Sequence, residues 1–479
     1  DYHINDRNVI TLSGSFAIED EDQPSETDFL IEDGEDGIIS SYRRTEETTA
    51  FNPKYQYDLK YEKKFKNNKE HTLQLSTLGS FFGKDLESEF FNVSLSGEQL
   101  DPNQQTETTF FKQDFIYQLD YTNTINENWT IESGGLYEIN DVGNDFTVRN
   151  ETEEGIFEVD SNFTNSFDFD QRVLGLYSTI AFENKTWGIK LGGRLENTDL
   201  ATLLKTTDQA NDQNYTNFFP SVHASYKVTE RFSMQAGYSR RIFRPQLWDL
   251  NPFFNVRNVY NIRQGNPELG PEFADSYELT TIYTFDKASI NTSIYHLYTT
   301  DIIERISVFE DDVNIVRPEN IGTKNQTGLE INGKYQPIKK WTINGDFNYG
   351  FFSRSGQFQD QDFSFEGTIW YVKMTNRFRV KKGLDLEATV NYNSPFDTVQ
   401  GEVSGFASAD AGVRKKLWKG KAIINLSVRD IFASRIRESF ARQDDFFLYS
   451  FSQRGRFIRL GFSYSFGKGE AMSYTGRRR

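Results

Sequence analysis

The chain is dominated by segments in which apolar and polar residues alternate with a period of two. Clear examples are 341–349, 384–393 and 458–466, where apolar side chains stand at every second position. Because successive side chains of a β-strand point to opposite faces, this period predicts strands with one apolar and one polar face. The polar face is consistent, and the segments are long and numerous. These features favour a membrane barrel over a soluble sandwich.

The connections between these segments are of two kinds, and the two kinds alternate along the chain. Short turns are predicted near 67–68, 126–128, 183–185, 229–230, 286–287, 338–340, 381–383 and 418–420. Longer polar segments lie between them, near 19–37, 83–104, 143–168, 201–213, 243–273, 305–323, 356–362, 395–404 and 434–452. Outer-membrane barrels have short periplasmic turns and longer extracellular loops, so the alternation predicts this topology.

The pattern predicts an all-β chain that forms a large antiparallel transmembrane β-barrel with about 18 visible strands. The first strand is expected from Val9 to Ile18, the second from Ile38 to Phe65, and the last ends at Phe466. The barrel is therefore assigned to residues 1–467, with long extracellular loops. Residues 468–479 are assigned to a solvated C-terminal tail.

The stretch from Phe232 to Leu279 holds the most specific motifs. It contains Tyr-Ser-Arg-Arg at 238–241, Asn-Pro-Phe at 251–253 and Gly-Asn-Pro-Glu-Leu-Gly-Pro-Glu at 265–272. Four prolines in its middle cannot donate backbone hydrogen bonds, so a long loop rather than a strand is predicted there. In this order and at this spacing, the motifs resemble those of the TonB-dependent receptors of Gram-negative outer membranes.

The resemblance implies an integral outer-membrane protein that takes up a scarce nutrient, such as a metal chelate, a cofactor or an oligosaccharide. Barrels of such transporters have about 22 strands and a plugged lumen. The chain is therefore expected to be part of a 22-stranded barrel, without the plug or the TonB box. The implied partners are outer-membrane lipid, TonB acting through an upstream plug, and, as a further option, a surface lipoprotein.

The amino-acid composition agrees with an outer-membrane barrel and argues against a nucleic-acid-binding protein. The 479 residues are only 37% hydrophobic but 15% aromatic, with a mean hydropathy of −0.64. Barrel strands face lipid at alternate residues only, so a low mean hydropathy is expected of them. The net charge of −17 argues against a nucleic-acid partner. The chain contains no cysteine, which excludes disulfides, and Asp1 does not begin a signal peptide. We therefore expect the chain to begin after processing or truncation.

The best candidates for a ligand site lie in the segment 243–273 and the strand end before it. The guanidinium groups of its arginines can pair with an anionic ligand, and its aromatic rings can stack on a sugar or an aromatic ligand. These residues are Arg240, Arg241, Arg244, Arg257 and Arg263, with Trp248, Phe253, Phe254 and Tyr260. In the alternative interpretation, the arginines neutralise acidic lumen residues and the rings pack the loop against the barrel rim.

No motif predicts an enzyme, a cofactor or a metal site. The four histidines are scattered without zinc-like spacing, and the acidic segments 19–22 and 32–36 lack the ligand spacing of a calcium loop. No phosphate loop or nucleophile elbow is present. Two alternatives to the receptor stay open: a passive porin-like channel, and a structural barrel subunit of an envelope complex.

Overall fold

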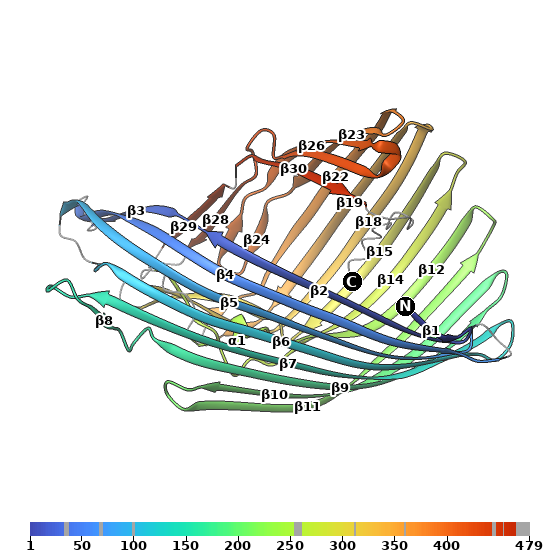
Figure 1. The fold of residues 1–479 in the computed structure, drawn as a ribbon, viewed down its shortest axis with the longest axis horizontal. Coiled ribbons are helices and arrows are strands. Elements are labelled where there is room, and N and C mark those ends of the chain that lie inside the picture. Colours follow the sequence, from blue (N-terminus) through green and yellow to red (C-terminus); the bar gives the residue numbers. More distant parts are fainter. Residues whose placement is uncertain are drawn as a thin grey trace.

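One antiparallel sheet of 21 strands makes up most of the protein and curves into an elongated trough (Figure 1). This computed structural model describes residues 1–32, 38–66, 70–97, 101–252, 261–310, 313–358, 361–442, 447–453 and 455–465. Within that part of the chain, no helix is long and apolar enough to cross a membrane. The helical elements are α1 (Leu247–Leu250) and the 3-10 turn η1 (Trp418–Gly420).

Eighteen strands form the main ladder, and β1 (Tyr2–Asn5), β3 (Ser25–Glu32) and β8 (Phe157–Val159) are short additions to it. The eighteen are β2 (Asn8–Asp22), β4 (Ile38–Lys64), β5 (Thr72–Gly97), β6 (Gln104–Thr124), β7 (Trp129–Glu151), β9 (Asn165–Glu183), β10 (Trp187–Leu204), β11 (Gln209–Lys227), β12 (Phe232–Phe243), β14 (Glu272–Thr284), β15 (Ala288–Thr300), β18 (Thr323–Ile338), β19 (Trp341–Ser355), β22 (Phe365–Lys381), β23 (Leu384–Asn393), β26 (Phe406–Leu417), β27 (Ala422–Arg429) and β30 (Phe457–Tyr464).

Three small sheets lie in the connections between these strands. The first contains β13 (Asn261–Arg263), β16 (Ile303–Glu310) and β17 (Val313–Asn320), and the second pairs β20 (Gln357–Phe358) with β21 (Gln361–Asp362). The third contains β24 (Phe396–Thr398), β25 (Gly401–Val403), β28 (Ile436–Arg442) and β29 (Phe447–Gln453).

Each ladder strand pairs with the ladder strands that precede and follow it in the chain. The two ends of the series are β2, which pairs with β4, and β30, which pairs with β27. Among the described residues, no pairing joins β2 to β30. The predicted fold class, a large antiparallel barrel sheet of about eighteen strands, is confirmed. The expected total of 22 strands stays a prediction.

The register aligns apolar side chains in rows across the outer face of the sheet. In one row Leu386 is opposite Val413, Val413 is opposite Leu426, and Leu426 is opposite Leu460. Leu386 is 41% exposed and Leu460 is 73% exposed, so neither side chain is packed in a protein core. The predicted alternation therefore produces an exposed apolar belt, which is the surface a barrel presents to lipid.

Aromatic pairs mark the edge of this belt beside the short turns. The ring centroids are 5.1 Å apart for Trp129 and Phe182 and 4.2 Å apart for Trp187 and Tyr226. At the far end of the sheet, Trp418 contacts Tyr464 at 5.7 Å. Aromatic girdles are typical of the two membrane interfaces of a barrel. The short-turn end of the ladder therefore lies at one interface.

Several strands extend well beyond the belt, which differs from the predicted loops at 83–104 and 143–168. Strands β4 and β5 are 27 and 26 residues long, whereas about 9–11 tilted residues cross a membrane. On the outer face of β4, Tyr61, Tyr57 and Phe51 give way to Thr49 and Glu47. The change from apolar to polar residues on the outer face therefore marks where contact with lipid ends. The strand pairing continues beyond that point.

We predict that substitutions on the two faces of β23 differ strongly in cost. Val390→Arg places a charge in the apolar belt and should reduce the free energy of unfolding from lipid vesicles by about 2–4 kcal/mol. Asn391→Arg changes the neighbouring inner-face residue and should cost much less. Urea titration of both variants in vesicles measures the difference. Equal costs would contradict the assignment of the outer face to lipid.

We also predict that the short turns are periplasmic and that the opposite ends of the strands are extracellular. Because the chain has no cysteine, single-cysteine variants can be labelled without background. Thr207→Cys lies in the turn between β10 and β11, and Lys382→Cys lies in the turn between β22 and β23. On intact cells, an impermeant thiol reagent should label the first variant only. Labelling of the second variant alone would reverse the topology.

Candidate functional site

The described parts of the segment between β12 and β14, residues 244–252 and 261–271, fold into the trough and pack on its inner wall, and we call them the inward segment. Leu247 and Leu250 of α1 and Leu269 form one cluster with buried side chains from four ladder strands. These strand residues stand on the face opposite to the apolar belt, and they are Phe110, Val142, Phe167, Phe169, Leu200 and Leu204. The apolar contacts hold the segment inside the sheet rather than above it.

The Gly-Asn-Pro motif of this segment has a structural role. The N–H groups of Gly265 and Asn266 donate to the carbonyls of Asn251 and Asp249, at 2.8 and 2.7 Å. A Cβ atom on Gly265 would lie 2.2 Å from the Asn251 carbonyl oxygen, so only glycine allows this approach. The Asn266 amide donates to Glu319 Oε2 at 2.9 Å, which ties the motif to β17.

The three-residue strand β13 corrects the expectation that the middle of the segment contains no strand. Asn261, Ile262 and Arg263 pair in parallel with Asn314, Ile315 and Val316 of β17. The prolines at 245, 252, 267 and 271 lie outside this short pairing. The prolines therefore exclude strand pairing only at their own positions, and the residues between them can still form a strand.

Arg244 lies in an ion pair on the inner wall. Its guanidinium donates to Glu196 Oε2 at 2.7 Å and to Thr198 Oγ1 at 2.9 Å. The Glu196 side chain is only 4% exposed, and it also pairs with Arg194 at 3.0 Å. This arrangement corresponds to the structural alternative, in which an arginine neutralises an acidic lumen residue.

Arg240 and Arg241 point to opposite faces of β12. Arg240 lies on the outer face, with its guanidinium 5.3 Å from the centre of the Phe273 ring. Arg241 lines a cavity of about 380 Å³ on the inner wall, together with Lys190, His223 and Glu278. The two arginines are adjacent in the sequence and were predicted as parts of one site, but their side chains lie on opposite faces of the sheet.

Trp248 and Arg263 come together at a second cavity, of about 230 Å³. Arg305, Gln264, Val316 and Pro318 complete its lining. The Trp248 ring is stacked on Phe110, with the centroids 5.5 Å apart. One aromatic ring and two guanidinium groups from three chain segments therefore converge on one concave surface.

The cavity has a net positive character. Arg305 pairs with Asp249 at 2.8 Å, whereas no ion pair of Arg263 is found among the described residues. Burial raises the pKa of the nearby Glu319 carboxyl, and Arg317 acts in the opposite direction. A second arginine beside a paired one favours an anionic group in this cavity.

The remaining predicted site residues are Phe253, Phe254, Arg257 and Tyr260, and they lie outside the described residues. Arg305 and Gln264 were not predicted from the sequence as site residues. Arg305 begins another predicted loop, and no spacing in the sequence relates it to Arg263. The pairing of β13 with β17 and of β17 with β16 brings these loops together.

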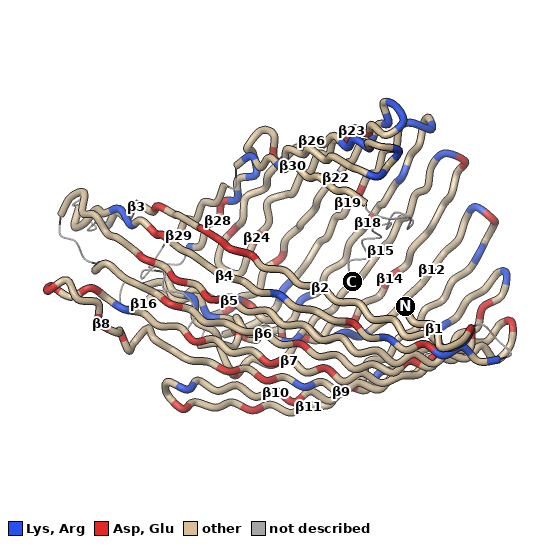
Figure 2. Tube along the Cα trace, in the orientation of Figure 1, with Lys and Arg blue, Asp and Glu red and all other residues tan. Residues whose placement is uncertain are grey.

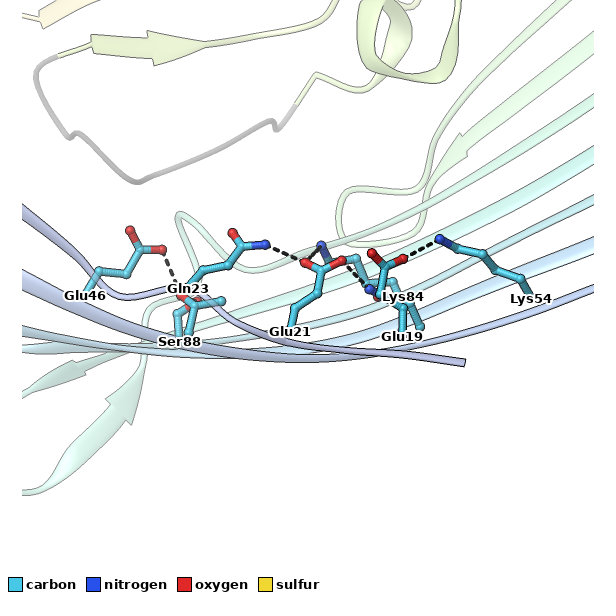
Figure 3. A network of polar contacts seen from close by, with 9 residues as sticks. Glu19, Glu21, Gln23, Glu46, Lys54, Lys84 and Ser88 are labelled. Carbon is cyan, nitrogen blue, oxygen red and sulfur yellow. Dashed lines mark hydrogen bonds and ion pairs between the residues drawn. The ribbon is translucent and has the colours of Figure 1, made fainter. Parts of the chain in front are cut away.

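The inner wall beside β2 carries a separate polar network, shown in Figure 3. Glu19 pairs with Lys54 at 2.5 Å, and Glu21 accepts a hydrogen bond from Asn52 at 2.6 Å and lies 3.8 Å from Lys84. These pairs join β2, β4 and β5 and balance acidic side chains with basic ones. Among the described residues, no group of three or more acidic or histidine side chains could hold a metal ion.

Comparison with known families finds a match to most of this chain. Residues 63–464 match the model of the Outer membrane protein beta-barrel family. No curated protein matches the chain in sequence.

Solved structures share the fold at low sequence identity. The copper transporter OprC is 12% identical with a TM-score of 0.56, and the alignment covers 96% of this chain and 80% of that one. The ferric-catecholate import receptor Fiu from K12 E. coli is 11% identical with a TM-score of 0.56, at 96% and 78% coverage. The ferric yersiniabactin uptake receptor FyuA from Yersinia pestis is 10% identical with a TM-score of 0.54, at 95% and 76% coverage.

We predict that the Glu196 carboxylate makes a large contribution to the stability of the inner wall. Glu196→Gln leaves Arg244 and Arg194 without a counter-charge and should lower the free energy of unfolding by about 3–5 kcal/mol. The matched control is Asp286→Asn, which breaks the exposed pair with Arg231 and should cost at most about 1 kcal/mol. Urea titration in vesicles compares the two. Similar small losses would show that the buried pair does not stabilise the wall.

Proposed function

Because this chain belongs to the outer membrane protein beta-barrel family and is an integral protein of the Gram-negative outer membrane, we propose that it forms the barrel of a TonB-dependent nutrient receptor. The motifs at 238–241, 251–253 and 265–272 support this proposal. So does the fold shared with uptake receptors. The proposal includes an upstream plug through which TonB acts, and a surface lipoprotein partner stays a prediction.

The observation that carries the proposal is the cavity bounded by Trp248, Arg263 and Arg305. It lies where the inward segment meets β16 and β17. The helix α1 of that segment lies away from the short turns (Figure 1). Guanidinium groups bind carboxylate or phosphate oxygens through paired hydrogen bonds, and an indole ring offers a flat face for stacking. The lining therefore suits an anionic ligand with a planar part.

Among the three expected nutrient classes, this lining favours a metal chelate. A chelate that carries carboxylate or phenolate groups supplies anionic oxygens and planar donor groups, whereas a neutral oligosaccharide carries no charge for the two arginines to pair with. The names of the similar structures, a copper transporter and receptors for ferric chelates, support the same class. In this account Arg263 and Arg305 attract and orient the ligand, and Trp248 stacks on it.

A passive channel is the second candidate. The eighteen-stranded ladder favours it, because porins of 16–18 strands leave an aqueous lumen. The inward segment that packs on the inner wall favours the receptor, since it narrows the lumen at the depth of α1.

We predict that loss of the cavity arginines reduces uptake. Once a panel of iron and copper chelates has identified a transported ligand, Arg263→Gln and Arg305→Gln should each weaken its binding about 10-fold or more, since a hydrogen bond to a charged group contributes about 1.5–3 kcal/mol. Arg231→Gln, in a short turn at the opposite end, is the control. Ligand titration of the purified receptor measures the change. Unchanged affinity in both variants would exclude this cavity as the ligand site.

We predict that uptake by the full-length gene product requires TonB. Cells with and without functional TonB should differ in accumulation of the labelled chelate, because a plugged barrel needs an energy input to open. Planar-bilayer conductance of the isolated chain gives an independent measurement. A uniform open channel together with TonB-independent uptake would establish the passive channel instead.

A further inference from the structure

The outer face of the sheet has an apolar hollow of about 630 Å³ across β2, β4, β5 and β6. Its lining includes Gly14, Phe16, Tyr55, Gly79, Phe81 and Phe115. The rings form a continuous wall, because Phe16 lies 5.2 Å from Tyr55 and Tyr55 lies 5.7 Å from Phe81 between ring centroids. No charged side chain lines the hollow.

Two glycines make this hollow. A Cβ atom on Gly14 would touch only the Gln56 carbonyl oxygen, at 3.6 Å, so the space above Gly14 is empty. Gly79 differs, since its Cβ would lie 2.2 Å from the Tyr57 ring, which therefore lies flat on the strand. The absent side chain at one position and the flattened ring at the other leave a depression between aromatic walls.

The hollow lies in the middle of the lipid-facing belt. On the outer face of β4, apolar residues run from Tyr61 to Phe51, and Tyr55 and Tyr57 are central in this run. Lipid tails are as apolar as leucine, so burial from water contributes nothing here. The relevant term is van der Waals packing, because a groove with walls on both sides makes more contacts with one chain than a flat surface makes.

A cationic group lies on the same face at the short-turn end of these strands. Lys63 is opposite Asn8 and Leu73 in the ladder, and its ammonium lies 5.0 Å from the centre of the Phe65 ring. No ion pair of Lys63 is found among the described residues. Beside it, the ring of His71 lies 3.0 Å from the Tyr121 hydroxyl, from Nε2 to Oη. Together these groups offer donors to a phosphate at the interface.

Some of the short turns are basic, as Figure 2 shows for the turns of β22, β23 and β26. The outer-face positions at the other end of β4 and β5 are acidic, with Glu47, Glu87 and Glu89. A lipid phosphate is therefore attracted to the Lys63 end and repelled from the opposite end. This difference selects the leaflet on the short-turn side as the source of a bound lipid.

We propose that the outer face of β2, β4, β5 and β6 binds one anionic phospholipid of the leaflet on the short-turn side. Its phosphate contacts Lys63, with His71 and Tyr121, and the end of one acyl chain occupies the hollow above Gly14. The site depends on the membrane location of the protein and not on the transported nutrient. A failed test would therefore leave the receptor proposal intact.

Photolabelling of the full chain in nanodiscs tests the site. The discs contain phosphatidylcholine with a small fraction of phosphatidylglycerol that carries a diazirine at the end of one acyl chain. After irradiation, peptides that contain 14–16, 55–57 and 79–81 should be labelled at least about 5-fold more than other peptides of the belt. Even labelling around the sheet would overturn the proposal, because it would show only ordinary surrounding lipid.

Gly14→Leu fills the hollow and should reduce labelling of these peptides to the level of the rest of the belt. Gly345→Leu is the matched control, because Gly345 is a lipid-facing glycine with open space around it, away from the hollow. It should leave the labelling unchanged. An unchanged pattern in Gly14→Leu, with the variant correctly folded, would overturn the proposal.

Lys63→Gln tests the headgroup contact without altering the hollow. This variant also tests the lipid site if Gly14→Leu does not fold. It should reduce labelling by the phosphatidylglycerol probe at least about 5-fold, while a phosphatidylcholine probe with the same chain should change little. Equal loss of both probes would contradict the role of charge. Cross-links between two copies through these strands in the wild-type protein would assign the hollow to a second copy and overturn the lipid site.

Discussion

The structure depends on one constraint, which is that backbone N–H and C=O groups in hydrocarbon must pair with each other. Long antiparallel ladders satisfy this constraint residue by residue, and here they run without a break from β2 to β30. The facing edges of β2 and β30 are subject to the same rule, since each unpaired group in lipid costs several kcal/mol. They are therefore the parts of the sheet with the greatest need for a partner.

The strand pairing determines which side chains lie on the outer face and which lie on the inner face. The two faces have different functions. The outer face needs only apolar side chains at alternate positions within the membrane. The inner face holds charges that balance each other, as Arg244 and Glu196 do, and it provides an apolar surface for the inward segment. That segment in turn positions Trp248 and Arg263 beside Arg305. The candidate ligand site is thus a consequence of packing on the inner wall.

Much of the fold could be predicted from the sequence, because the two-residue period directly reports which face a side chain takes. Strand number and pairing order follow from that period and from the short turns. The length of β4 was predicted, since the second strand was expected from Ile38 to Phe65. The strand extensions into 83–104 and 143–168 were not predicted, because polar residues that continue a ladder beyond the lipid resemble loop residues. The candidate site could be predicted only in part. Trp248 and Arg263 were identified from residue type, whereas the contribution of Arg305 depends on loop pairing that leaves no local signal.

The most direct test of this account is a nitroxide scan along β4, from Lys63 to Ile39, in lipid vesicles. The absence of native cysteine allows one spin label at each position. We predict a two-residue period, with outward positions from Tyr61 to Phe51 accessible to oxygen in lipid. From Thr49 to Ile39, the outward positions should become accessible to a water-soluble relaxation agent while the period continues. Loss of the period beyond Phe51, or lipid contact along the whole strand, would contradict it.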